Sequence, residues 1–214
     1  MTQNSIDSGP GRERLTGVVL AGGLARRMGG RDKGLIEVGG RPMIAYIVER
    51  LRPQVDVLLV NANRNAEAYA GITGCRVIPD RVGDFAGPLA GMASALEAAR
   101  GGWVLTVPCD SPLIATDLAR RLQEAASTRA AEIAVATDGQ RMQPVFALLH
   151  CSLLADLLRY LDDGGRKIDR WYARRRTVEV DLSDRGDTFL NVNTPEEQRR
   201  IEERLRACAR GEEC

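Results

Sequence analysis

A glycine-rich segment with several cationic side chains follows the first apolar run of the sequence. Residues 20–34 read Leu-Ala-Gly-Gly-Leu-Ala-Arg-Arg-Met-Gly-Gly-Arg-Asp-Lys-Gly. Glycines let backbone N–H groups approach an anion closely, and the cations supply the charge that a polyphosphate requires. The segment matches neither the Walker A pattern nor the Gly-x-Gly-x-x-Gly dinucleotide pattern, and the alternative is a solvated surface loop. We expect phosphate binding here, with charge from Arg26, Arg27, Arg31 and Lys33.

A carboxylate follows another apolar run, at residues 103–107. Asp110 comes directly after this predicted strand, where it faces the crevice at the carboxyl ends of a parallel sheet. A bound triphosphate needs a divalent cation, and Mg²⁺ is typically held by one or two carboxylates together with phosphate oxygens and water. The alternative is that Asp110 caps a following helix. Asp80, after a third apolar run, is a second polar anchor or only part of a turn.

Asparagines mark two further positions. Asn61, in the run Asn-Ala-Asn-Arg, follows a predicted strand, and its amide can fix a base or a sugar. Asn191 and Asn193 lie two residues apart on an extended segment, so their side chains point the same way and can bond one ligand. The plain alternatives are a turn at Asn61 and a helix-preceding scaffold at Asn193.

Other chemistries find little support. The only histidine, His150, shows no paired nucleophile, so a Ser–His–Asp or Cys–His site is not expected. An odd number of cysteines, five, without a Cys-x-x-Cys pair argues against a disulfide framework or a zinc site. The basic cluster Arg170, Arg174, Arg175 and Arg176 is interpreted as a solvated helix end, although an anionic substrate could use it.

Charge and composition restrict the partners. Thirty basic and 29 acidic residues give a net charge of +1, and aromatic residues make up 4%. This balance favours neither nucleic acid nor a membrane surface as a partner. No apolar run reaches the roughly 18–20 residues of a membrane helix, and residues 1–14 do not resemble a secretory signal. We therefore expect a cytoplasmic protein that binds anions at a local site.

Strands and helices alternate through the first two thirds of the chain, which predicts an α/β fold: a single Rossmann-like domain with a mostly parallel twisted sheet and helices on both faces. The predicted strands cover residues 15–20, 55–60, 75–78, 103–107, 133–136, 143–149 and 177–182. The predicted helices cover residues 42–51, 88–100, 115–127, 151–161 and 167–174, with a last helix from Pro195. We expect a disordered leader at 1–14, one domain at 15–206 and a frayed tail at 207–214.

Five motifs, in order, resemble those of the molybdenum cofactor guanylyltransferases. They span residues 16–197 and are Thr16–Lys33, Val60–Arg64, Gly87–Met92, Pro108–Pro112 and Asn191–Glu197. The resemblance implies a nucleotidyltransferase fold and transfer of GMP from GTP to the terminal phosphate of molybdopterin, with release of pyrophosphate and with Mg²⁺ as cofactor. It also implies transient protein partners in cofactor delivery.

The resemblance further assigns roles to individual residues. Lys33, Arg27 and Asp110 are expected to be catalytic, and Asp110 is expected to bind the metal as well. Asn191 and Asn193 are expected on the pterin side. The expected GTP-binding residues are Leu20, Ala21, Gly22, Lys33, Asn61, Asp80 and Asp110.

The acceptor phosphate is already an anion and needs no general base, so positioning and charge neutralisation suffice for this chemistry. Three alternatives stay open at this point: a CTP-dependent molybdopterin cytidylyltransferase, a sugar-phosphate nucleotidyltransferase, and a non-catalytic GTP sensor. The choice of GTP over CTP rests on the resemblance of the first and third motifs.

Overall fold

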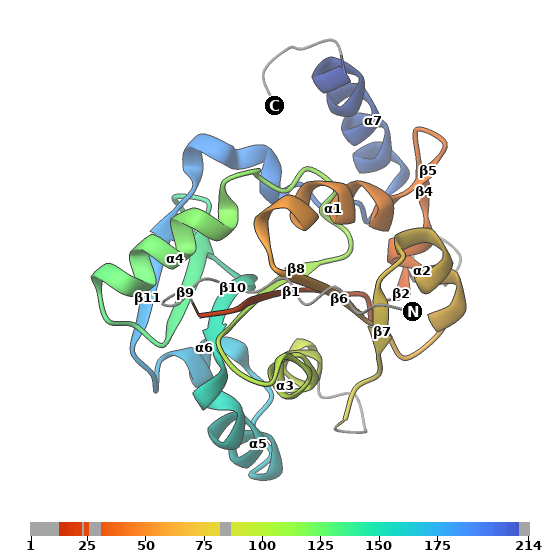
Figure 1. The fold of residues 1–214 in the computed structure, drawn as a ribbon. Coiled ribbons are helices and arrows are strands. Elements are labelled where there is room, and N and C mark those ends of the chain that lie inside the picture. The colour runs from red at the N-terminus through yellow and green to blue at the C-terminus, as the bar shows by residue number, and fades with distance from the viewer. Residues whose placement is uncertain (1–12, 23, 26–30, 82–86, 210–214) are drawn as a thin grey trace.

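One seven-stranded sheet forms the centre of the computed structural model, in the order β11-β9-β10-β8-β1-β6-β7 (Figure 1). The structure describes residues 13–22, 24–25, 31–81 and 87–209. The strands of this sheet are β1 (Leu15–Leu20), β6 (Val57–Asn61), β7 (Arg76–Ile78), β8 (Trp103–Pro108), β9 (Ile133–Thr137), β10 (Met142–His150) and β11 (Thr177–Asp181).

The sheet is mostly parallel, as predicted. β1 runs parallel to β6 and to β8, β6 to β7, and β11 to β9. Of the seven strands, β10 alone runs antiparallel, to both β8 and β9. This strand is the predicted segment without a preceding helix, and a short turn after β9 can only reverse the chain because a parallel return requires a long crossover.

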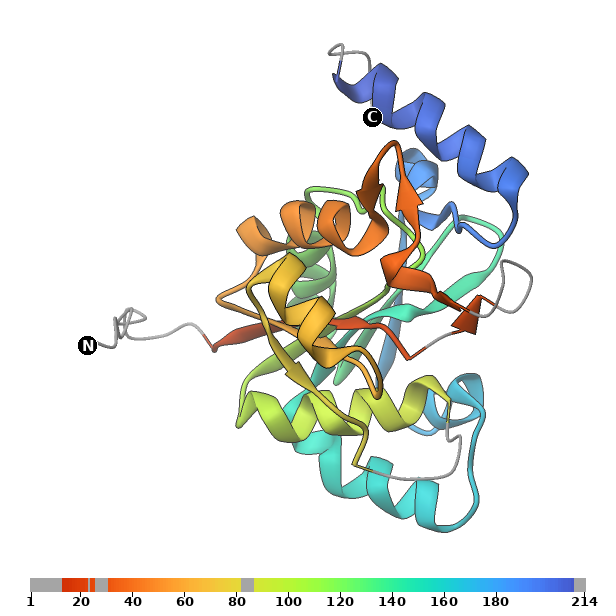
Figure 2. The same cartoon turned by 90° about the vertical axis from the view of Figure 1, so that its right-hand side faces the viewer.

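Helices cover both faces of the sheet, which confirms the predicted α/β architecture (Figures 1 and 2). α1 and α4 pack on one face with α2 beside them, and α3, α5 and α6 pack on the other. Each face buries its own apolar cluster. The helices are α1 (Met43–Leu51), α2 (Ala66–Thr73), α3 (Pro88–Ala99), α4 (Leu118–Thr128), α5 (Leu154–Asp162), α6 (Ile168–Tyr172) and α7 (Pro195–Ala209).

Three helices differ most from the prediction, and α5 is one of them: it begins at Leu154, after the 3-10 turn η4 (Cys151–Leu153), and not at residue 151. α2 was not predicted: it presents few apolar side chains, and only Tyr69 and Thr73 are buried. α4 begins at Leu118 and not at residue 115. The residues before Leu118 form turns, and Ala115 uses its carbonyl oxygen to accept a hydrogen bond from the Gln54 side chain at 2.9 Å.

Two short hairpins and a 3-10 turn link β1 to α1. β2 (Leu24–Ala25) pairs with β3 (Arg31–Asp32), and β4 (Glu37–Val38) pairs with β5 (Arg41–Pro42). Between the hairpins lies the 3-10 turn η2 (Lys33–Leu35). The turn η2 thus follows the first hairpin and carries Lys33, whose side chain contacts Asp110 just after β8.

The last helix, α7, starts with the predicted capping box. The Glu197 N–H donates to Thr194 Oγ1 at 3.2 Å, and the Thr194 N–H donates to Glu197 Oε2 at 3.0 Å. Pro195 occupies the first helical position, where its missing N–H costs nothing. Within the described ranges, no helix has the length and apolarity needed to cross a membrane.

Candidate active site

The carboxyl ends of the central strands meet at one edge of the sheet. Ala21, directly after β1, donates its N–H to the Asn61 carbonyl at 2.8 Å, and the Cys109 N–H donates to the Leu20 carbonyl at 3.2 Å. The ends of β1, β6 and β8 are thereby fastened side by side. In an open parallel sheet, this edge is where ligands bind.

Three of the predicted site residues come together at this edge. Lys33 Nζ lies 2.8 Å from Asp110 Oδ2 and also donates to Asn193 Oδ1. The Lys33 and Asp110 side chains are only 21% and 15% exposed, so their charges act on each other through a partly desolvated medium. Asp110 and Asn193 lie 77 and 160 positions after Lys33 in the chain, yet the three side chains form one polar centre.

A second polar cluster lies at the ends of β6 and β7. The buried Asn61 amide donates to Asp80 Oδ1 at 2.9 Å and to the Ile78 carbonyl at 3.2 Å. Asn63, to which we assigned no role from the sequence, donates to Asp80 Oδ2 at 2.7 Å and accepts from the Asp80 N–H at 2.7 Å. Asn61 and Asp80 are therefore direct partners, and the turn around Asn63 orients the carboxylate.

The two asparagines of the late extended segment both face the loop after β8. Asn191 Oδ1 accepts a hydrogen bond from Ser111 Oγ, and the Val192 N–H donates to the Asp110 carbonyl at 2.9 Å. Asn193 is fixed at its backbone as well, because its N–H donates to Glu197 Oε2 at 2.7 Å. Ser111 was missed from the sequence, although it lies beside Asp110 in the same motif.

The end of β1 and the start of α3 approach each other closely. Gly22 is exposed, and a Cβ placed on it would meet nothing within 4 Å. Gly91 has no such room, because a Cβ there would lie 2.5 Å from Asn61 Oδ1 and 3.1 Å from Leu20 Cδ2. The small residue at position 91 therefore lets α3 pack against the Asn61 amide.

Several predictions made from the sequence have specific outcomes. Asp110 does not cap a helix, since α4 begins eight residues later and the carboxylate pairs with Lys33. His150 lies at the opposite edge of the sheet, where it pairs in register with Trp103 at the start of β8. Arg27 lies outside the described residues.

The basic cluster near α6 is engaged within the protein. Arg174 stacks over the Tyr160 ring at 5.1 Å, Arg175 pairs with Asp156, and Arg176 pairs with Glu132. Two of the four arginines, Arg175 and Arg176, therefore already have a carboxylate partner.

The thiol of Cys109, next to Asp110, is buried and protonated. Burial raises the pKa of Cys109 to about 12, so that the thiol stays protonated at neutral pH. A nucleophilic thiolate is therefore not part of this site.

One carboxylate at this centre, that of Asp110, could bind a metal ion. Across the described ranges, no cluster of three or more His, Cys, Asp or Glu side chains could bind a metal. The single, partly buried carboxylate of Asp110 fits a divalent cation that takes its other ligands from phosphate oxygens and water.

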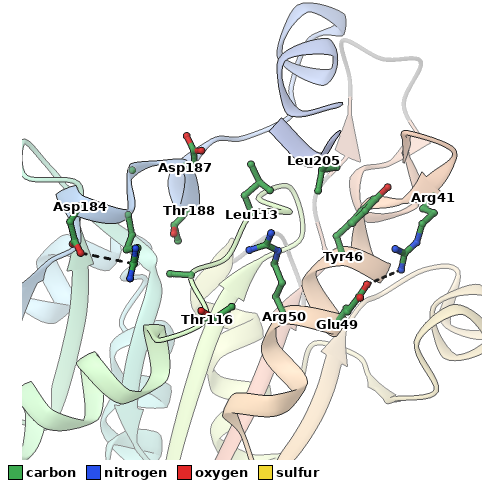
Figure 3. Close-up of a pocket in the computed structure, with 13 residues that line it drawn as sticks. Arg41, Tyr46, Glu49, Arg50, Leu113, Thr116, Asp184, Asp187, Thr188 and Leu205 are labelled. Atoms are coloured by element: carbon green, nitrogen blue, oxygen red, sulfur yellow. Dashed lines mark hydrogen bonds and ion pairs between the residues drawn. The ribbon is translucent and has the colours of Figure 1, made fainter. Parts of the chain in front are cut away.

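A hollow of about 780 Å³ lies elsewhere, between α1, the loop after β8, the 3-10 segment η5 (Ser183–Phe189) and α7 (Figure 3). Glu49, Arg50, Leu113 and Thr188 are among its lining residues. None of the predicted site residues that the structure describes lines it. The site is therefore defined by the contacts at the strand ends and not by this hollow.

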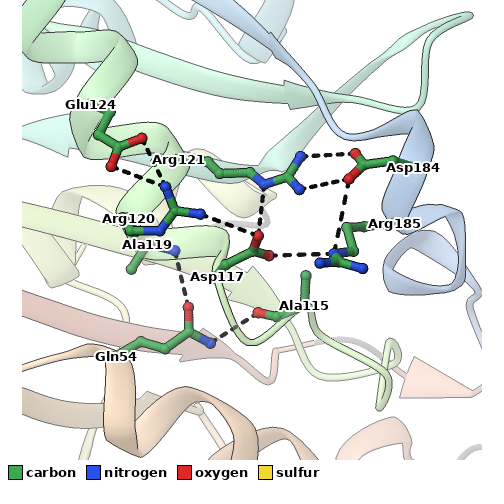
Figure 4. Close-up of polar contacts among 9 residues, drawn as sticks. All are labelled: Gln54, Ala115, Asp117, Ala119, Arg120, Arg121, Glu124, Asp184 and Arg185. Atoms are coloured by element: carbon green, nitrogen blue, oxygen red, sulfur yellow. Dashed lines mark hydrogen bonds and ion pairs between the residues drawn. The ribbon is translucent and has the colours of Figure 1, made fainter. Parts of the chain in front are cut away.

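An ion-pair network joins α4 to η5, the segment that leads to Asn191 (Figure 4). Arg121 donates from both terminal nitrogens to Asp184, at 2.8 and 2.6 Å, and from Nε to Asp117 at 2.8 Å. Burial alone would raise the pKa of Asp117, but its bonds and charge contacts to Arg121 and Arg185 lower the pKa on balance. The hydrogen bond from Arg121 likewise lowers the pKa of Asp184.

Comparison with known proteins identifies close relatives. The profile of the family described as MobA-like NTP transferase domain matches residues 17–178. The molybdenum cofactor guanylyltransferase of Shewanella piezotolerans is 46% identical over 191 residues, covering 89% of this chain and 93% of the relative. That of Shewanella halifaxensis is 47% identical over 192 residues, covering 90% and 96%.

Solved structures share the fold. Molybdopterin-guanine dinucleotide biosynthesis protein A from Archaeoglobus fulgidus superposes with a TM-score of 0.75 at 22% identity, covering 89% of this chain and 98% of that one. Rv0371C from Mycobacterium tuberculosis, solved as a complex with manganese, gives a TM-score of 0.63 at 23% identity, covering 89% and 98%. With the family match and the identity to the Shewanella proteins, these results show that the chain is a nucleotidyltransferase of the molybdenum cofactor guanylyltransferase family.

Proposed function

We infer that this enzyme transfers GMP from GTP to the terminal phosphate of molybdopterin, which forms the guanine dinucleotide cofactor and releases pyrophosphate. The observation that carries this inference is the meeting of Lys33, Asp110 and Asn193 at the carboxyl edge of the sheet. Relatives that match about nine tenths of the chain at 46–47% identity bear the name of this activity.

The reaction requires the two substrates to be positioned and their charge to be neutralised. An oxygen of the acceptor phosphate forms a bond to the α-phosphorus of GTP, the bond from that phosphorus to the β-phosphate breaks, and pyrophosphate leaves with the electron pair. The attacking oxygen is already anionic, so no proton has to be removed by a base. Positioning and neutralisation of the developing charge are the tasks left to the protein.

We assign these tasks to the residues at the strand ends. Lys33 and Arg27 neutralise phosphate charge, and Asp110 holds Mg²⁺, which when bound supplies charge neutralisation at the phosphate oxygens. The Lys33–Asp110 contact of 2.8 Å supports this, because both groups already point to one place. Asn191 and Asn193 orient the pterin end. The proposed nucleotide contacts are Leu20, Ala21, Gly22, Lys33, Asn61, Asp80 and Asp110.

The organisation around the site is part of the proposal. We place the nucleotidyltransferase domain at residues 15–206, between a leader (1–14) and a tail (207–214). We also place the enzyme in the cytoplasm, with GTP and molybdopterin as substrates, transient protein partners for cofactor delivery, and no nucleic-acid or membrane partner.

Nucleotide choice separates this function from its alternatives. The purified protein is titrated calorimetrically with GTP, CTP and ATP, each with and without Mg²⁺, and then assayed for pyrophosphate release with molybdopterin. Selective, Mg²⁺-dependent GTP binding followed by transfer is the expected result. Preference for CTP would move the function to a cytidylyltransferase, and GTP binding without transfer would identify a sensor.

A control variant strengthens the assay. His150 lies at the opposite edge of the sheet with its side chain 31% exposed. His150→Gln should therefore bind GTP and transfer GMP like the unmodified enzyme. A loss of transfer in this variant would show that the assay reports general damage and not the site.

A further inference from the structure

A buried carboxylate that the proposed mechanism does not use lies directly before Lys33. The Asp32 side chain is only 3% exposed, and it accepts hydrogen bonds from Arg64 Nη2 and, at 2.8 Å, from Asn65 Nδ2. Both donors lie in the turn between β6 and α2. Burying an ionised carboxylate costs free energy unless the charge is paired. The contact with Arg64 and Asn65 therefore stabilises Asp32 in its buried position.

Among the described residues, the hydrogen-bond partners of the Asp32 carboxylate are distant in the chain. Asp32 is the residue before the 3-10 turn η2, yet its side chain makes no capping hydrogen bond to that turn. Both of its partners are more than 30 residues away along the chain. The function of Asp32 is therefore a tertiary one, the attachment of the Lys33 turn to the β6–α2 turn.

The same two segments are held together on a second side. A Cβ on Gly34 would lie 3.0 Å from Tyr69 Cε1 and 3.3 Å from Cys109 Cβ, so the η2 backbone packs tightly between α2 and the end of β8. Lys33 is thus flanked by a salt link on its N-terminal side and close packing on its C-terminal side. The position of its backbone is defined before any ligand binds.

The turn that contains Arg64 directly follows Asn61, one of the proposed nucleotide contacts. Asn61 and Asn63, just upstream of Arg64, hold the Asp80 carboxylate. The Asp32 link therefore connects two groups of the crevice: Asn61 with Asp80 on one side, and Lys33 with Asp110 on the other.

We propose that Asp32 is a positioning residue for nucleotidyl transfer, which acts by fixing Lys33 relative to the Asn61–Asp80 cluster. The proposal rests on the proposed function and deepens it. Asp32 touches neither Asp110 nor Asn193 in the structure, so its effect passes through Lys33. Misplacing a charged group by about 1 Å can cost on the order of 100-fold in rate.

Asp32→Asn keeps the shape of the side chain but removes its charge, and it replaces one acceptor oxygen with an N–H donor. Arg64 then loses its ionic partner, and we expect GTP affinity and kcat each to fall by about 10- to 100-fold. The decisive measurement is the double variant with Lys33→Ala. A residue that acts through Lys33 should have little further effect once Lys33 is gone, so the two losses should not multiply.

A matched control separates positioning from folding. Asp156 on α5 is also a partly buried carboxylate, 19% exposed, that pairs with Arg175 and accepts from Trp171 Nε1 at 2.9 Å. It lies on the far face of the sheet among the α5–α6 contacts. Asp156→Asn should lower the melting temperature without changing GTP affinity or kcat by more than about twofold, well below the 10- to 100-fold loss expected for Asp32→Asn.

The outcomes are distinct. Asp32→Asn with wild-type affinity and rate, or with the same fold loss in the Lys33→Ala background, overturns the proposal. GTP binding is measured alongside transfer because an unmodified enzyme that binds GTP without transferring GMP would contradict the proposed function. The binding cycle between positions 32 and 33 would still decide the role of Asp32 in that case.

Discussion

Replacing Gly91 by alanine tests the close approach of α3 to the Asn61 amide. The new methyl group would lie 2.5 Å from Asn61 Oδ1, well inside van der Waals contact. Asn61 is 3% exposed and is tied to the Ile78 carbonyl and to Asp80, so it can move only by giving up these bonds. The substitution therefore has two opposing effects: alanine favours the helix, and its methyl group overpacks the contact with Asn61.

The two effects have different sizes. Alanine improves helix propensity over glycine by about 1 kcal/mol, whereas overpacking a dense core costs about 1–3 kcal/mol. The net change is a loss of up to about 2 kcal/mol in the free energy of unfolding. Gly71 is the matched control, because it lies inside α2 and an added Cβ meets nothing within 4 Å. Gly71→Ala should show the propensity gain alone.

Thermal unfolding and GTP titration of both variants measure the difference. For a chain of this length about 1 kcal/mol corresponds to about 2–4 °C, so Gly91→Ala should melt about 2–12 °C below Gly71→Ala. Displacement of Asn61 should also weaken GTP binding in the first variant only. If Gly91→Ala melts as high as the control and binds GTP normally, the packing argument for this position is wrong.

Three further predictions concern Asp110, the Tyr69 hydroxyl, and the carboxylates of Asp117 and Asp184. Asp110→Ala should abolish Mg²⁺-dependent transfer with little change in melting temperature, and near-normal turnover would remove Asp110 from the mechanism. Tyr69→Phe should leave stability unchanged or raise it by up to about 1 kcal/mol, because the buried Tyr69 hydroxyl has no hydrogen-bond partner among the described residues; a large loss of stability in a melt would contradict this. The pKa values of Asp117 and Asp184 are lowered by folding, so their stabilisation is present above the unfolded value of about 3.9 and is lost as pH falls through the folded values. Urea unfolding from pH 7 to 2.5 should show a steeper acid loss in the unmodified protein than in Arg121→Leu, and equal slopes would refute the role of this network.

The fold was predictable because its signals are local. The apolar run at β1 and the Thr194–Glu197 capping box each predict an element from a few adjacent residues, and both were confirmed. α2 carries a weak signal because its apolar face is small and Ile72 is 41% exposed. Periodicity cannot identify a helix that buries so little.

Several residues of the polar centre could be singled out from the sequence, but their contacts with one another could not. Lys33 was singled out as a cation of the glycine-rich segment, Asp110 by its position after a strand, and Asn193 by its spacing from Asn191. Their mutual contacts nevertheless span up to 160 positions. The partners of Asp32 are beyond sequence reasoning for the same reason. An aspartate before a lysine looks like a loop residue until the fold brings Arg64 to it.

This long-range construction ties the site to the whole fold. Lys33 lies in the segment after β1, and Asp110 lies just after β8. Asn193 lies directly before α7, where the capping box fixes its backbone. None of these segments can place its side chain without the others, since each contact joins distant parts of the chain. A nucleotide that bridges the Asn61–Asp80 cluster and Lys33 would bind only the folded state. Such a ligand must stabilise the protein in proportion to the logarithm of its concentration over its dissociation constant.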